Sequence, residues 1–209
     1  AWAVDGADVV VLGVKPVGIA ALAAQIAPLL APHTVVVSVA AAITLATLEA
    51  ALPAGQPVVR SMPNTPLQLG AGVVGISRGT SADDAAVATA SAVFSDSGEV
   101  FEVPESQIDA LSAVSGSGPA YAFYLAEAMA DGGVALGLDR ELALRLASAT
   151  IAGGGAMLSQ PGADPVALRR AVTSPNGTTE RAIKTFDQLG VREAIAAGEK
   201  AAAERATAL

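Results

Sequence analysis

Residues 8–14 read DVVVLGV, an apolar run dominated by β-branched side chains. Such a run predicts a strand buried on both faces, as in a parallel sheet with helices on either side. The pattern around it alternates, with further strands predicted at residues 34–39, 57–62, 72–77 and 99–103 and helices at residues 17–30, 44–52 and 81–95. We expect Ser81 to be the N-cap of the last of these helices. The βαβαβ order predicts an α/β fold with a parallel, doubly wound sheet.

From Pro104 onward the strand signals stop. Helical patterns follow over residues 106–115, 119–136, 140–158, 165–172, 178–189 and 191–206. We therefore expect a sheet domain over residues 1–104 and an all-helical domain over residues 105–209. Many nicotinamide-dependent reductases have this layout, but a shared layout is only an analogy for function.

Composition excludes several classes of chemistry. The 209 residues are 52% hydrophobic and only 3% aromatic, and the net charge is −8. No basic tract is present, so nucleic acid is not an expected partner. The absence of cysteine excludes disulfides and thiolate catalysis, and a single histidine, His33, excludes a histidine-rich metal site. No metal is predicted, and an enzyme of this composition would depend on a bound cofactor for difficult chemistry.

The stretch between Lys15 and Glu49 carries no formal charge, which raises the question of a membrane span. Pro28 and Pro32 interrupt it, whereas a bilayer helix needs about 20 continuous apolar residues. The first residues contain no basic segment of the kind that opens a signal peptide. We expect a cytoplasmic protein with no membrane attachment.

A dinucleotide-binding fold carries a glycine-rich phosphate loop after its first strand. No G-x-G-x-x-G pattern lies between a strand and a helix in the first half of this chain. The chain opens just ahead of what would be a middle strand. Either an N-terminal βαβ unit is missing from this chain, or the sheet domain does not bind a dinucleotide.

Residues 172–179, VTSPNGTT, directly precede a helical pattern. The first turn of a helix has backbone N–H groups without internal partners, and its dipole is positive there. Such a segment can therefore bind a carboxylate or a phosphate. The alternative is an ordinary helix cap with a turn, which contributes about 1 kcal/mol.

Other candidate segments lie where strands or helices end. Loops at the carboxyl ends of parallel strands commonly bind ligands. Three segments have this position: GVKP at residues 13–16, SVAAA at residues 38–42 and RSMPNTP at residues 60–66. A fourth, SGSGPAY at residues 115–121, interrupts a helical pattern and exposes backbone for a close approach.

Taken together, these segments resemble the pyrroline-5-carboxylate reductases. The matching text is VKP, SVAA, RSMPNTP, PESQIDALSAVSGSGPAYAF and VTSPNGTT, in family order from about Ala7 to Ala206. The resemblance implies a Rossmann-like domain, incomplete at its N-terminus, followed by an all-α dimerisation domain. It also implies reduction of the C=N bond of 1-pyrroline-5-carboxylate to L-proline with NADPH or NADH. Members of the family form homodimers, and many assemble further into decamers.

The resemblance also implies roles for single residues. Thr179 matches the hydrogen-bond partner of the substrate ring nitrogen and is the expected catalytic residue. The expected substrate-binding residues are Glu105, Ser174, Gly177, Thr178 and Thr179. The expected cofactor-binding residues are Gly13, Val14, Lys15, Pro16, Val39, Ala40 and Ala41.

Two positions depart from the family pattern besides the absent phosphate loop. Asn176 replaces the first glycine of a pair, and asparagine tolerates a left-handed backbone better than other non-glycine residues. Ala42 replaces a glycine, at a cost of about 1 kcal/mol if that position has a positive φ.

Two alternatives to the reductase remain at this stage. One is a β-hydroxyacid dehydrogenase of similar layout, although Lys184 and Lys200 lack the glycine-rich context of its catalytic lysine. The other is a truncated, non-catalytic helical dimer module. Under all of these hypotheses we expect an obligate dimer. The alanines and glycines between positions 143 and 158 permit close helix packing, and a lone helical unit would leave apolar faces exposed.

Overall fold

The computed structural model describes residues 3–208, which form two compact units. One unit contains the residues up to Pro119 and those from Glu199 onward, and the other is Ala120–Gly198. The domain boundary expected at Pro104 stays a prediction.

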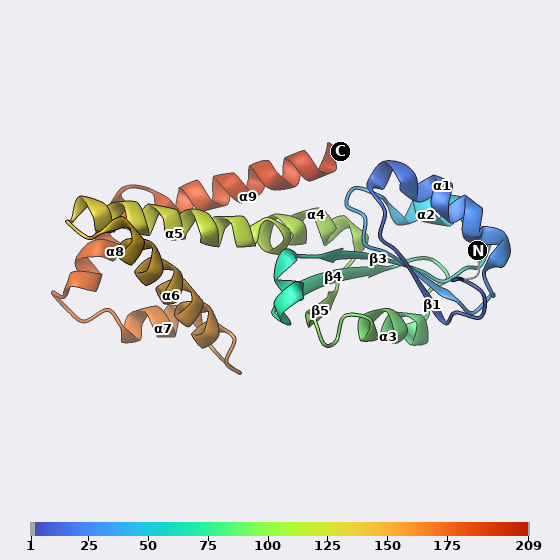
Figure 1. Cartoon of the computed structure of the whole chain (residues 1–209), viewed down its shortest axis with the longest axis horizontal. Helices are drawn as coiled ribbons and strands as arrows, with labels where there is room; N and C mark the ends of the chain where they lie inside the picture. Colours follow the sequence, from blue (N-terminus) through green and yellow to red (C-terminus); the bar gives the residue numbers. More distant parts are fainter. Residues whose placement is uncertain (1–2, 209) are drawn as a thin grey trace. The chain divides into compact units, whose positions relative to one another are not determined.

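The first unit is built on a five-stranded sheet with strand order β1-β2-β3-β4-β5 (Figure 1). Its strands are β1 (Val9–Leu12), β2 (Val35–Ser38), β3 (Val58–Pro63), β4 (Gly72–Arg78) and β5 (Gly98–Glu102). Every predicted strand is therefore present, within a few residues of its expected ends. The predicted fold class, an α/β domain followed by helices, is confirmed.

One strand pairing differs from the fully parallel sheet that we predicted. Strands β3 and β4 run antiparallel, whereas the other three pairs are parallel. Only residues 64–71 connect them, and these include the short 3-10 helix Thr65–Leu69. A parallel crossover needs a dozen or more residues, so a link this short returns the chain in the opposite direction.

Helices cover both faces of the sheet (Figure 1), as a doubly wound fold requires. They are α1 (Pro16–Ile26), α2 (Leu45–Ala51) and α3 (Asp84–Ala92). Val36 of β2 packs in the cluster with α1 and α2, whereas its neighbours Val35 and Val37 pack in the cluster with α3. The alternation explains why the run TVVVSV is apolar at successive positions, since both faces of β2 are buried.

The N-cap of α3 is Asp83, and the prediction of Ser81 was wrong. The Asp83 carboxylate accepts a hydrogen bond from the backbone N–H of Ala86 at 2.8 Å. Serine and aspartate cap helices about equally well, so composition did not distinguish the two positions.

The predicted helix over residues 106–115 is broken into shorter pieces. A 3-10 turn at Glu105–Gln107 leads into α4 (Ile108–Leu111), and a π-helical turn follows at Ser112–Gly116. In that turn the Ser117 N–H donates to the Ser112 carbonyl at 2.9 Å, five residues back. Such π-turns recur at functional sites and carry little sequence signal.

The remaining helices are α5 (Gly118–Ala135), α6 (Arg140–Leu158), α7 (Pro165–Ala171), α8 (Thr178–Gln188) and α9 (Val191–Thr207). They match the predicted helices closely. The described part of the second unit has a core cluster of only three alanines, Ala130, Ala143 and Ala147. Large apolar side chains on α5 and α6 are exposed instead, including Phe123, Leu125, Met129, Leu142, Leu146 and Met157. Apolar faces this extensive are typical of surfaces that bind another protein.

No helix among residues 3–208 has the length and apolar character needed to cross a membrane.

Two non-glycine residues of the described chain have a left-handed backbone, Ala42 at φ 63° and Asn176 at φ 60°. These are the two positions at which the sequence departs from the glycine-containing family pattern. The condition on which we predicted strain at Ala42 is therefore met.

We predict that Ala42→Gly raises the free energy of unfolding by about 0.5–1 kcal/mol. Removing Cβ relieves left-handed strain of about 1–2 kcal/mol, and the greater freedom of glycine in the unfolded chain offsets about 0.4–1 kcal/mol of that gain. Urea unfolding measures the change. Ala41→Gly is the matched control, since Ala41 has no positive φ and gains nothing from the change. Equal destabilisation by both substitutions would contradict the assignment of strain to Ala42.

Candidate functional site

The segment that connects α7 to α8 forms a tight turn. Gly177 donates its N–H to the Ser174 carbonyl at 3.0 Å, and Asn176 between them has the left-handed backbone. Gly177 is the N-cap of α8 and has no side chain with which to cap it. In an ordinary helix cap, the alternative to an anion site, a side-chain oxygen accepts hydrogen bonds from the first-turn N–H groups. Because that oxygen is absent here, the N-terminus of α8 keeps its capacity for an anion.

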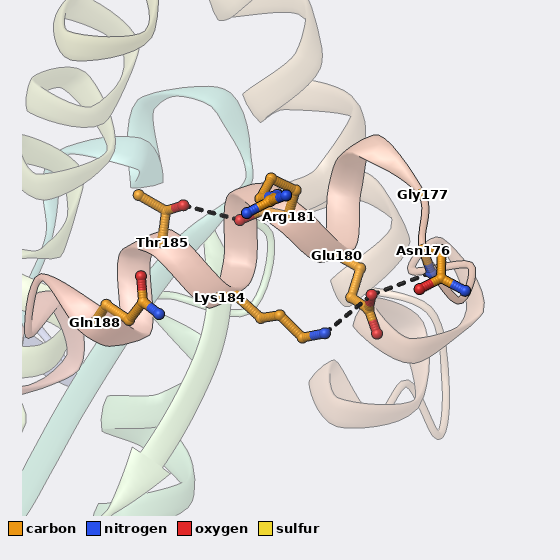
Figure 2. Close-up of a pocket in the computed structure, with 7 residues that line it drawn as sticks. All are labelled: Asn176, Gly177, Glu180, Arg181, Lys184, Thr185 and Gln188. Carbon is orange, nitrogen blue, oxygen red and sulfur yellow. Dashed lines mark hydrogen bonds and ion pairs between the residues drawn. The ribbon is translucent and has the colours of Figure 1, made fainter.

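Glu180 stabilises this turn from the first turn of α8. Its Oε2 accepts a hydrogen bond from the Asn176 N–H at 3.1 Å and lies 3.1 Å from the Lys184 ammonium (Figure 2). The Lys184 ammonium, together with the Asn176 N–H, holds the pKa of Glu180 below its usual range. Glu180 is therefore ionised and bound locally at neutral pH.

A pocket of about 380 Å³ lies along the face of α8 that carries Glu180 and Lys184 (Figure 2). It is lined by Asn176, Gly177, Glu180, Arg181, Lys184, Thr185 and Gln188. The lining residues recur every three or four positions, as one face of a helix requires. All of them are polar or small, so the pocket is suited to a charged molecule.

The predicted substrate residues of the second unit lie at or beside this turn. Ser174 and Thr178 are exposed, whereas Gly177 and Thr179 are half-buried. All four come within six positions of the chain, so the turn alone brings them together.

In the first unit the structure brings the two predicted cofactor segments together. Strands β1 and β2 are adjacent and parallel, and the Val39 N–H donates to the Leu12 carbonyl at 3.2 Å. The loop at residues 13–16 and the loop at residues 39–41 therefore leave the same edge of the sheet. Residues 13–16 and Ala41 are exposed, Val39 is half-buried and Ala40 is buried.

These loops fit one end of a dinucleotide. The Val39 side chain lies beside Gly13, since a Cβ built on Gly13 would be in ordinary van der Waals contact with Cγ2 of Val39 at 4.0 Å. Small side chains and exposed backbone at the carboxyl edge of a parallel sheet suit a flat nicotinamide ring. The residues present fit the nicotinamide end, whereas the glycine-rich phosphate loop is not among them.

Glu105, which we expected beside the substrate, has partners within the first unit. Its Oε1 accepts the Leu45 N–H at 2.7 Å and lies 2.9 Å from Nη1 of Arg60. It therefore belongs to a different compact unit from Ser174, Gly177, Thr178 and Thr179.

Two side chains in the RSMPNTP segment have structural roles that the sequence pattern did not predict. Asn64 accepts the Val73 N–H at 2.9 Å and donates to the Ser115 carbonyl at 3.0 Å, which links this loop to the π-helical turn. Arg60 is buried in β3 and pairs with Glu105. An arginine inside a predicted buried strand was the available signal, because a buried charge needs a partner.

No group of three or more histidine, aspartate or glutamate side chains suited to a metal ion occurs between residues 3 and 208.

The chain is similar to known proteins over its whole length. A family model described as pyrroline-5-carboxylate reductase dimerisation matches residues 105–209. A pyrroline-5-carboxylate reductase from Pseudomonas aeruginosa is 46% identical over 100% of this chain and 77% of its own length. The chain belongs to the pyrroline-5-carboxylate reductase family. The relative from Corynebacterium melassecola is 42% identical over 99% of this chain and 78% of its own length.

Solved structures of the family agree with this assignment. The reductase from Coxiella burnetii superimposes with a TM-score of 0.92 at 37% identity, over 96% of this chain and 75% of that one. The enzyme from Plasmodium falciparum, with NADP bound, gives a TM-score of 0.83 at 27% identity, over 96% of this chain and 76% of that one. The resemblance that we drew from the motifs is thereby confirmed.

The left-handed turn at Asn176 leads to a prediction for substrate affinity. Asn176→Val should raise KM for 1-pyrroline-5-carboxylate roughly tenfold, because a β-branched residue strains this backbone by about 1–2 kcal/mol. Asn176→Gly should leave KM within about twofold of the parent value, since glycine adopts the same backbone freely. Steady-state kinetics at saturating cofactor measures both. An unchanged KM in Asn176→Val would separate the turn geometry from substrate binding.

Proposed function

We propose that this chain reduces 1-pyrroline-5-carboxylate to L-proline, the reaction for which its family is named. The observation that carries the proposal is the turn at residues 173–177, which leads into a helix without a capping side chain. The substrate is a small cyclic imine with one carboxylate. Family membership argues against the β-hydroxyacid dehydrogenase alternative.

The start of α8 would hold the substrate carboxylate. The backbone N–H groups of its first turn point out of the helix end, and the helix dipole favours a negative charge there. Ser174, Gly177 and Thr178 would line this cradle. A carboxylate held in this way fixes the position of the ring, and such positioning accounts for much of the rate in reactions of this type.

Thr179 would hydrogen-bond the ring nitrogen, which gains a proton as the C=N bond becomes CH–NH. A threonine hydroxyl is a weak acid by itself. We therefore assign Thr179 the relay of a proton from water, or a hydrogen bond to the protonated iminium form of the substrate. Neither role needs histidine or cysteine, in agreement with the composition.

The loops at residues 13–16 and 39–41 would border the nicotinamide end of NADPH or NADH. The bound nicotinamide supplies the hydride in this reaction. The relative from Plasmodium falciparum has NADP bound, which favours NADPH. Lys15, exposed at the start of α1, is placed to meet an anionic or amide group of the cofactor.

The active assembly would be a cytoplasmic homodimer. The family model covering residues 105–209 is a dimerisation domain, and the exposed apolar side chains of α5 and α6 need a partner surface. Light scattering at micromolar concentration should give at least twice the mass of one chain, and a monomeric mass would contradict the proposal.

Activity of the purified chain tests the proposed reaction. Incubation with 1-pyrroline-5-carboxylate and NADPH should give substrate-dependent loss of the reduced nicotinamide absorbance, with L-proline formed in equal amount. A folded dimer that neither binds nor oxidises NADPH would favour the non-catalytic module instead.

Substitution of Thr179 tests whether its hydroxyl takes part in the reaction. Thr179→Ala should lower kcat by roughly 10²-fold, the lower end of the usual contribution of acid–base groups. Thr179→Ser, which keeps the hydroxyl, should recover most of that loss. Thermal unfolding should be nearly unchanged in both, because this half-exposed side chain lies in a helical first turn. Turnover in Thr179→Ala at the parent rate would remove Thr179 from the mechanism.

A further inference from the structure

Arg60 brings a buried positive charge into the sheet. Its side chain in β3 is only 7% exposed. Nη1 lies 2.9 Å from Oε1 of Glu105, and Nη2 lies 3.9 Å from Oδ1 of Asp109. A buried guanidinium is tolerated only when carboxylates pair with it, so Arg60 fixes the position of the nearer one, Glu105.

Glu105 also accepts a hydrogen bond from the first residue of α2. The same Oε1 that meets Arg60 accepts the N–H of Leu45 at 2.7 Å. Leu45 is the first residue of α2, and its N–H has no partner inside the helix. A hydrogen bond with an ionised acceptor is about twice as strong as one between neutral groups, so this bond fixes the start of α2.

The segment between β2 and α2, residues 39–44, is therefore held at both ends. At its start, Val39 donates its N–H to the Leu12 carbonyl, and the Ala40 N–H donates to Oγ of Ser38 at 3.3 Å. At its end is the bond from Leu45 to Glu105. The strained residue Ala42 lies between these anchors, and strain of this kind persists only where the surrounding structure holds the backbone in place.

We propose that Glu105, oriented by Arg60, is a positioning residue that holds residues 39–44 in shape for the nicotinamide cofactor and does not bind substrate. The inference rests on the proposed contact of residues 39–41 with the cofactor. It replaces the substrate role that the family resemblance implies for Glu105, and it assigns a purpose to the buried Arg60.

Two readouts on the whole of this chain test this role. The first is the dissociation constant for NADPH, measured by nicotinamide fluorescence without substrate, together with the separate KM values for NADPH and 1-pyrroline-5-carboxylate. The second is hydrogen exchange at the Leu45 amide, measured by NMR, which does not depend on cofactor or turnover.

Glu105→Ala should weaken NADPH binding roughly tenfold, as expected for loss of a charge-assisted bond. KM for 1-pyrroline-5-carboxylate should stay within about twofold of the parent value, and the Leu45 amide should exchange faster. Glu105→Gln keeps an acceptor oxygen for Leu45 and should recover much of both changes. If Glu105→Ala does not fold, Glu105→Gln serves as the test variant. Relative to the parent chain, it should weaken NADPH binding and speed exchange at Leu45, each by a smaller factor than expected for Glu105→Ala.

Asp109→Ala is the matched control. It also removes a carboxylate beside Arg60, but Asp109 makes no hydrogen bond to α2, and its Oδ2 accepts from the Thr207 hydroxyl instead. It should leave NADPH binding and Leu45 exchange within about twofold of the parent values.

Three results would overturn the proposal. A rise in KM for 1-pyrroline-5-carboxylate with NADPH binding unchanged would make Glu105 a substrate contact. Equal weakening by Glu105→Ala and Asp109→Ala would reduce the effect to general loosening around Arg60. An unchanged exchange rate at Leu45 would show that Glu105 does not hold α2. If the parent chain binds no NADPH at all, the proposed function itself fails, and faster exchange at Leu45 then supports only the structural half of the inference.

Discussion

The start of α8, which has no capping side chain, is the constraint on which the proposed chemistry depends. A helix leaves its first N–H groups without partners, and proteins usually satisfy them with a serine, threonine, asparagine or aspartate cap. Here a glycine occupies the N-cap, and the left-handed Asn176 turns the chain sharply in front of it. Glu180 holds that turn by binding the Asn176 N–H, and Lys184 keeps the carboxylate charged. This helix end therefore has no capping side chain, and we propose that the substrate carboxylate binds there.

Small side chains shape both units. In the first unit, glycine and alanine follow the ends of β1 and β2, at the sheet edge where we propose that the flat nicotinamide ring binds. In the second unit, the core cluster of the described residues consists of alanines, and the larger apolar side chains of α5 and α6 are exposed. A helical unit that buries so little within one chain needs a partner surface, as the dimerisation family to which it belongs also indicates.

Much of this architecture could be predicted from sequence because it depends on local patterns. The apolar run around β1 and the helical periodicity beyond Pro104 gave the elements within a few residues. The antiparallel turn from β3 to β4 could also have been predicted, since eight linking residues leave no room for a crossover. Contacts between positions far apart in the sequence could not be predicted in this way. No local pattern shows that Arg60 meets Glu105, 45 residues later, or that Asn64 fastens the π-turn at Ser115.

The candidate site divides in the same way. The turn at Asn176 and the strain at Ala42 followed from comparing single residues with a glycine-containing pattern, and both backbone angles agree. The hydrogen-bond partners of Glu105 could not be predicted from such a comparison, because they depend on the position of α2 in the folded chain.

The start of α8 is proposed to bind the substrate carboxylate, and NMR tests this binding most directly. In an isotope-labelled chain, titration with L-proline, the proposed product, should shift the backbone amide signals of Thr178, Thr179 and Glu180 saturably. Proline amide, which lacks the carboxylate charge, should shift them far less. Equal shifts with both compounds, or no shift at these three amides from a chain that turns over substrate, would contradict the account.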